Sequence, residues 1–158
     1  MTGADALLVF LALGVALLLA RGSHPLVAML LVASALAVSA LLFLPTALLG
    51  DWFGMDRVHR LYGLTRATPL DPPEWIHFLA FGWLGLLVWL ARKDVRNGWG
   101  VLLVAALGVA AELSQWLTDG RQLKLEDAAL NVIGGLAGVL LAHLFRLAGT
   151  YARRKNAK

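Results

Sequence analysis

Five polar residues lie at the junction of two long apolar runs in the stretch AELSQWLTDGRQLKLEDAALN, residues 111–131: Glu112, Gln115, Arg121, Asp127 and Asn131. Asp127 and Asn131 are four residues apart, and side chains at that spacing share one face of a helix. An arginine near such groups can bind a phosphate or a carboxylate with its planar fork. These residue types and spacings predict a polar ligand-binding site.

His77, in the apolar run before these two, adds a titratable group to this set. His77 and Glu112 are the kind of pair that can serve as general acid and base when their environments push their pKa values apart. No nucleophile stands in a recognised setting, because Ser114 is turned away from Glu112 on a helix. No close ligand spacing supports a metal site. The residues therefore leave ligand binding and catalysis both open, and we predict neither a metal nor a cofactor.

The composition is that of a membrane protein. The chain is 59% hydrophobic and only 15% charged, against roughly 25% charged residues in an ordinary soluble domain. The apolar residues form long blocks near the ~20 residues that a helix needs to cross the bilayer. An outer-membrane barrel would instead show short alternating segments. The formal charge is +4, but the basic residues sit in short connections and in the C-terminal tail, where membrane topology explains them. We therefore predict no nucleic-acid partner.

The fold class predicted is an all-α, polytopic transmembrane bundle in a single membrane domain. The apolar blocks predict five spans, at about residues 4–20, 26–49, 73–91, 99–117 and 128–147. Short connections make neighbouring spans antiparallel. The N-terminal run has no preceding Lys or Arg and no clear cleavage site, so we expect a retained helix rather than a signal peptide.

The distribution of Lys and Arg predicts the orientation. With the C-terminus in the cytoplasm, most basic residues are cytoplasmic: Arg21, Arg92, Lys93, Arg96, Arg146, Arg153, Arg154, Lys155 and Lys158. A smaller group then lies outside: Arg57, Arg60, Arg66, Arg121 and Lys124. Five spans place the N-terminus outside as well.

The longest connection, residues 50–73, lies outside in this topology. Apolar residues recur in it every three or four positions, opposite charged ones, which predicts a short helix lying in the membrane interface. The apolar residues are Trp52, Met55, Val58, Leu61 and Tyr62. Such a helix would serve as a lid or spacer, or as a surface that touches a substrate or partner.

The polar residues share a depth in the outer half of the bilayer. Counted from the middle of its span, Glu112 lies roughly 6 Å outward, and His77 and Asn131 lie roughly 8 and 10 Å outward. A carboxylate there costs on the order of 2 to 3 kcal/mol to insert and is expected to face the bundle interior. Gly134 and Gly138 form a small-residue face that lets another helix approach closely.

Structural roles compete with functional ones at the other positions. Asn131 and Gln115 can act as interhelical hydrogen-bond glue, and Asp127 stands where a helix N-cap would. His77 can be satisfied by Glu74 or by water. Glu112 is the exception, because a buried carboxylate is an expensive way to hold helices together.

The second half of the chain resembles the VanZ-like family of small integral membrane proteins. The resemblance rests on HFLAFGWLG, ELSQW and GRQLKLEDAALNVIGGLAGVLL, over a core of about residues 73–145. The matching positions are His77, Phe78, Phe81, Gly82, Glu112, Gln115, Gly120, Arg121, Asp127, Asn131, Gly134 and Gly138. Where the family often carries Asp-Lys before the histidine, this chain has Pro73 and Glu74, which removes a lysine from any anion-binding role there.

The resemblance implies a place of action more than a reaction. The family's namesake is associated with low-level resistance to the glycopeptide teicoplanin, and relatives occur with envelope and exopolysaccharide genes. The resemblance therefore implies action at the outer face of the bacterial cytoplasmic membrane.

Three functions remain open. The first is binding of a lipid-linked envelope component or glycopeptide by His77 and the five polar residues above. The second is a membrane-embedded transferase or hydrolase acting on a lipid-linked substrate, with His77, Glu112 and Asp127 as candidate catalytic residues. The third is an accessory subunit of a larger membrane complex, in which the cluster only holds helices together.

Overall fold

The fold of the described part of the chain is entirely helical. The computed structural model describes residues 3–43, 54, 60, 63, 68–96, 98–116 and 124–156. The helices within these residues are α1 (Gly3–Ala20), α2 (Pro25–Phe43), α5 (Pro72–Ala91), a 3-10 turn η1 (Lys93–Val95), α6 (Gly98–Trp116) and α7 (Leu125–Asn156). The predicted all-α class is confirmed.

Three helices match the predicted spans closely. α1, α5 and α6 begin and end within one residue of the predicted bounds. α2 is helical to Phe43, and the remainder of its predicted span lies outside the described residues. The predicted interfacial helix also lies outside them, since only Gly54, Arg60 and Gly63 are described between residues 44 and 67.

α7 is longer at both ends than the predicted span of residues 128–147. Its first turn carries Glu126 and Asp127, and its last turn carries Arg153, Arg154 and Lys155. Acidic groups at the N-terminus and basic groups at the C-terminus both interact favourably with the helix dipole. Helix formation therefore continues past the apolar run from which the span was predicted.

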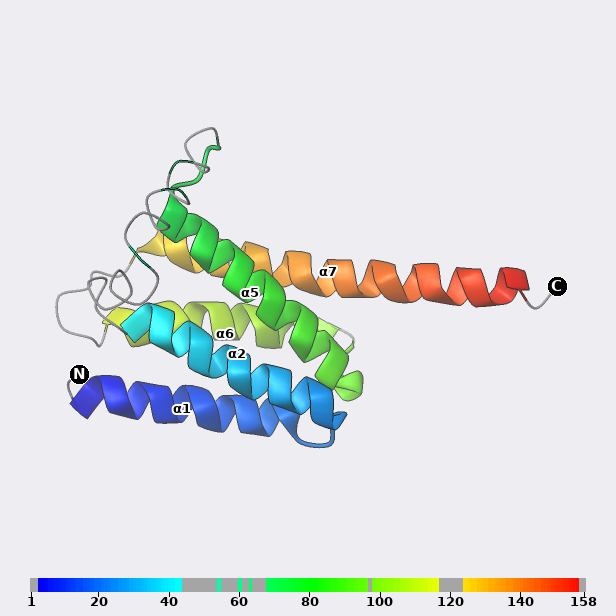
Figure 1. Cartoon of the computed structure of the whole chain (residues 1–158), viewed down its shortest axis with the longest axis horizontal. Helices are drawn as coiled ribbons and strands as arrows, with labels where there is room; N and C mark the ends of the chain where they lie inside the picture. The colour runs from blue at the N-terminus through cyan, green and yellow to red at the C-terminus, as the bar shows by residue number, and fades with distance from the viewer. Residues whose placement is uncertain are drawn as a thin grey trace.

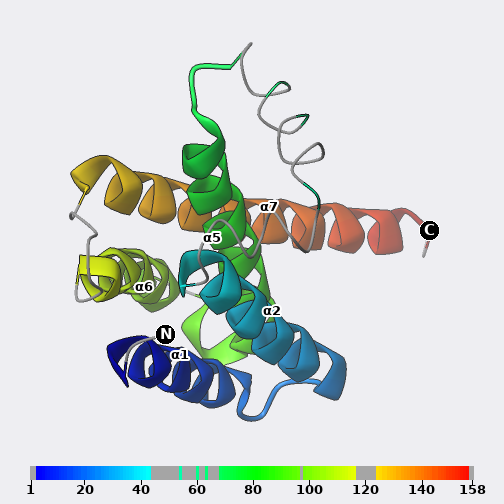
Figure 2. The same cartoon turned by 60° about the vertical axis from the view of Figure 1, so that its left-hand side comes forward.

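Successive helices run in alternate directions (Figure 1). One end of the bundle, called the His77 end below, holds the starts of α5 and α7 and the end of α6. The opposite end, called the Arg96 end, holds the α1–α2 and α5–α6 connections. α5 is central and packs against each of the other four α-helices in the described structure (Figure 2).

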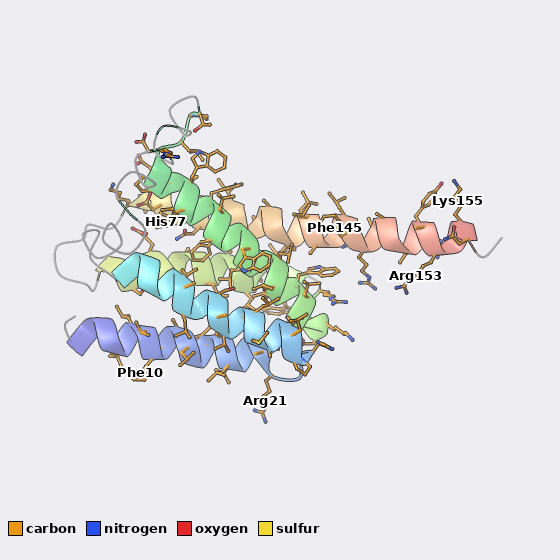
Figure 3. All side chains as sticks on the ribbon, viewed as in Figure 1. Phe10, Arg21, His77, Phe145, Arg153 and Lys155 are labelled. Atoms are coloured by element: carbon orange, nitrogen blue, oxygen red, sulfur yellow. The ribbon has the colours of Figure 1, made fainter. Side chains whose placement is uncertain are left out.

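Within the described residues, two helices are long and apolar enough to cross a membrane, Pro73–Ala91 and Leu125–Asn156. Three shorter helical stretches are also apolar: Leu7–Ala20, Pro25–Val38 and Gly98–Ser114. Large apolar side chains cover the outside of the bundle, among them Phe10, which is 70% exposed, and Phe145, which is 64% exposed (Figure 3). An outer surface of this kind suits contact with lipid far better than contact with water.

α5 and α7 cross in close backbone contact through glycines on both helices. A Cβ on Gly134 would overlap the carbonyl of Phe78, and a Cβ on Gly138 would overlap the carbonyl of Gly82. Small residues at such crossings let helix backbones approach each other in membranes. The predicted glycine face on the fifth span is therefore confirmed, and its partner is α5.

The apolar core lies where α1, α2, α5 and α6 meet. Leu31, Leu87, Val88 and Val104 are almost completely buried there and form one cluster. A hydrogen bond from Trp83 Nε1 to Ser34 Oγ, 2.8 Å long, links α5 to α2. These contacts fix the position of α5, which carries His77.

Candidate functional site

His77 lies in the second turn of α5 and faces α7 at the His77 end of the bundle (Figure 3). Its ring is buried, and Nδ1 is 2.9 Å from Asn131 Oδ1. Glu74 does not take part, because its Oε2 accepts a hydrogen bond from the Asp71 backbone N–H at 2.7 Å and so closes the start of α5. The expectation that Glu74 could satisfy His77 is therefore wrong.

Asn131 joins three helices. It is completely buried in α7, and its Nδ2 donates to the backbone carbonyl of Gly108 in α6 at 3.2 Å. Since the amide nitrogen donates there, the oxygen accepts, and Nδ1 of His77 carries the proton that it receives.

Gly108 makes this contact possible. A Cβ on Gly108 would lie 3.2 Å from Asn131 Cβ and 3.1 Å from the Val132 backbone nitrogen, tighter than carbon side chains normally pack. The sequence reasoning missed Gly108, because its contribution is a backbone carbonyl rather than a side chain. A glycine one turn before Glu112 was the only available signal.

Asp127 faces the other ring nitrogen of His77. Asp127 Oδ2 is 3.8 Å from His77 Nε2, an ion-pair distance when the imidazole is protonated, and the Asp127 side chain is 18% exposed. α7 begins at Leu125, so Asp127 is its third residue and the predicted N-cap position is wrong. The carboxylate still lies in the first turn, where the helix dipole favours negative charge.

Glu112 is buried between α6 and the start of α7. It is 2% exposed, and its Oε1 accepts a hydrogen bond from the Lys124 backbone N–H at 2.8 Å. Lys124 is the N-cap of α7, because its carbonyl accepts the first helical hydrogen bond from Ala128. Glu112 therefore satisfies one of the free N–H groups that every helix start presents.

The second oxygen of Glu112 differs from the first. Oε2 is buried and has no hydrogen-bond partner among the described residues. An unsatisfied buried polar atom costs roughly 1 to 3 kcal/mol, and more if it is charged. Native structures contain few such atoms, and each calls for a specific explanation.

The structure brings three of the predicted residues into direct contact, namely His77, Asp127 and Asn131. Glu112 makes no hydrogen bond to these three. It lies one helical turn from Gly108, whose carbonyl receives the Asn131 hydrogen bond. We call His77, Glu112, Asp127 and Asn131 together the polar cluster.

The remaining predicted residues are only partly described. The side chain of Gln115 and all of Arg121 lie outside the described residues. The Ser114 hydroxyl donates to the Ala111 carbonyl at 2.7 Å, a local helical hydrogen bond. Across the described part of the chain, no group of three or more His, Asp or Glu side chains is arranged to hold a metal ion.

Apolar helices of alternating direction, with polar side chains buried where three of them meet, indicate a helical membrane protein with a polar cluster inside one end of its bundle. Comparison with known protein families is more specific. The VanZ/LLP1 family model matches residues 52–146, more than half of the sequence, and the chain belongs to this family. The matched segment contains the whole polar cluster and also part of the long connection before α5. No curated protein and no solved structure matches the chain.

Proposed function

We propose that the chain acts at the outer face of the bacterial cytoplasmic membrane, where the polar cluster binds a lipid-linked envelope component or a glycopeptide. The observation that carries this proposal is the buried Oε2 of Glu112, which has no hydrogen-bond partner within the described part of the chain. Membership of the VanZ/LLP1 family supports a membrane location. The excess of Lys and Arg at the Arg96 end supports an outward-facing His77 end.

The chemistry of Glu112 defines the kind of ligand. An ionised carboxylate is an acceptor only, so the group that satisfies Oε2 must donate a proton in a hydrogen bond. Sugar hydroxyls, peptide N–H groups and ammonium groups all do so, and lipid-linked saccharides and glycopeptides carry many of them. Arg121, in the connection between α6 and α7, is proposed to bind a phosphate or carboxylate of the same ligand.

A membrane-embedded transferase or hydrolase is the second candidate, favoured by the contact between His77 and Asp127. A carboxylate beside an imidazole can orient it for proton transfer. Against this candidate, both ring nitrogens of His77 already face protein groups, Asn131 Oδ1 and Asp127 Oδ2. Catalysis would require this arrangement to open when the substrate binds.

The third candidate is an accessory subunit in which the cluster only joins helices. The hydrogen bonds from His77 through Asn131 to Gly108 fit such a role, because they link α5, α7 and α6. The second oxygen of Glu112, which has no partner among the described residues, does not fit it. The test of the proposal is therefore directed at Glu112.

The test is Glu112→Gln in the full-length protein. The glutamine oxygen can still accept from Lys124 N–H, so yield and thermal unfolding should stay close to those of the parent. Binding of teicoplanin and of a polyprenyl-linked disaccharide to the purified protein should weaken by about ten-fold or more, as expected when a charge-assisted hydrogen bond is lost. Glycopeptide tolerance or envelope polymer output in cells should fall with it.

The matched control is Glu126→Gln. Glu126 is an exposed glutamate in the first turn of α7, and its replacement should leave binding unchanged. A Glu112→Gln protein with normal yield, normal unfolding and full activity would contradict both the ligand-binding and the enzymatic candidates. The accessory subunit would then remain.

A further inference from the structure

A second site lies at the Arg96 end of the bundle, away from the polar cluster. A cavity of about 330 Å³ opens between α5, α6 and α7, at the lower end of the size range of small-molecule sites in proteins. On α7 the cavity is lined by residues from Leu136 to His143, which all follow Asn131 in the sequence. None of the four residues of the polar cluster lines the cavity, so the two are separate sites.

The wall of the cavity is apolar toward the middle of the bundle and cationic toward its end. Leu136, Val139 and Leu140 of α7 line it beside Val88 of α5 and Val101 of α6. The rest of the lining is Trp89, Arg96, Gly100 and His143. From Leu136 to Arg146 the helix changes from apolar to basic over roughly 15 Å, and a membrane lipid has the same sequence of an apolar chain and a polar headgroup.

Two guanidinium groups converge on one aromatic ring at the cationic end. The Arg96 Cζ atom lies 4.2 Å from the ring centroid of Trp89, and the Arg146 Cζ atom lies 5.9 Å from it. The His143 ring meets the same indole edge to face, with 6.4 Å between centroids. Burial lowers the pKa of Arg96, and the nearby charge of Arg146 lowers it further.

Structural roles explain only part of this arrangement. Arg96 donates from Nε to the Trp89 carbonyl at 3.0 Å and from one terminal nitrogen to the Leu90 carbonyl at 3.4 Å, so it closes the C-terminus of α5. Arg146 has no such bond, and among the described residues neither arginine forms an ion pair with a carboxylate. Two unpaired cations held beside each other attract an anion.

We propose that this cavity binds one anionic phospholipid, with an acyl chain along Leu136 and Leu140 and the phosphate between Arg96 and Arg146. Arg96 is held in place by its carbonyl contacts before the lipid arrives, and arginine forks match phosphate oxygens well. Basic pockets between membrane helices are known to take lipid headgroups in this way. The proposal is independent of the function assigned to the polar cluster.

The experiment compares lipids on the purified full-length protein in a non-ionic detergent, with retention read by native mass spectrometry. Phosphatidylglycerol should be retained at one molecule per chain, and phosphatidylcholine should not. Arg146→Gln should weaken retention by about ten-fold, because one charge-assisted contact to the phosphate is lost. Arg146 makes no hydrogen bond among the described residues, so the variant should fold normally.

Arg153→Gln is the matched control, since Arg153 is exposed on the same helix beyond the cavity. It should retain phosphatidylglycerol as the parent does, whereas Leu140→Trp, which fills the cavity mouth, should lose it. Equal retention of phosphatidylcholine would overturn the proposal. Equal losses in Arg146→Gln and Arg153→Gln would also overturn it, because they would indicate attraction by diffuse charge. Displacement of the lipid by millimolar glycerol phosphate would overturn it as well, because it would indicate a site for free phosphate.

Discussion

At the scale of single residues, the buried polar groups fall into two kinds. Asn131 has a partner at both its oxygen and its nitrogen, and these partners come from two other helices. Among the residues that the structure describes, Glu112 has a partner at one oxygen only. Satisfied amides join membrane helices, whereas an unsatisfied carboxylate is a cost that a ligand would remove. We therefore propose a structural role for Asn131 and a ligand-binding role for Glu112.

Asn131→Leu tests the structural role. Leucine has nearly the same size but leaves His77 Nδ1 and the Gly108 carbonyl without their partner, so stability should fall by roughly 1 to 3 kcal/mol. Thermal unfolding of the purified protein in detergent measures this. Asn156→Leu, at the exposed end of the same helix, is the control and should change little. Equal unfolding temperatures in the two variants would contradict the role of Asn131 as a bridge.

At the scale of elements, the crossing of α5 and α7 decides whether the site exists. α5 supplies His77 and α7 supplies Asp127 and Asn131, and the two helices touch through the glycines that follow these residues in sequence. A wider crossing would separate the imidazole from both of its partners. The same glycines therefore support the fold and the site.

Gly138→Ala is expected to destabilise the protein, although alanine forms helices better than glycine by about 1 kcal/mol. The new methyl group would overlap the carbonyl of Gly82, and overpacking of this kind costs roughly 1 to 3 kcal/mol. Gly149→Ala is the control on the same helix, because nothing lies within 4 Å of its added Cβ, and it should be neutral or stabilising. Thermal unfolding of both variants measures the difference, and an equal response would show that the close contact is unimportant.

At the scale of the whole molecule, the charges distinguish the two ends. Arg21, Arg153 and Lys155 lie away from His77 along the bundle (Figure 3). The 32 residues of α7 extend to roughly 48 Å, against about 30 Å of hydrocarbon. Its basic C-terminal turns therefore project past the other helices (Figure 1). This geometry suits a cytoplasmic C-terminus, by the usual excess of Lys and Arg on that side.

Cysteine labelling tests this orientation, and the absence of cysteine from the chain makes it clean. Glu126→Cys and Lys155→Cys place single thiols near the two ends of α7. A membrane-impermeant maleimide should label position 126 in intact cells and position 155 only after permeabilisation. The reverse pattern would contradict the orientation and would move the polar cluster to the cytoplasmic side.

Some of these conclusions required only the sequence. The helical class, the bounds of α1, α5 and α6, the glycine face and the family could all be predicted from the order of residues. The length of an apolar run and the cost of a charge within it are local properties. For the same reason the polar residues near the centre of these runs could be picked out before their partners were known.

The partners themselves depended on the tertiary structure. Hydropathy does not report how a helix is rotated about its axis, and rotation decides that His77 of α5 faces Asn131 of α7. Backbone groups carry no sequence signal, so the bonds to Gly108 and Lys124 could not be foreseen. The cavity beside Arg96 and Arg146 likewise exists only where three helices diverge, because a cavity is a property of their packing.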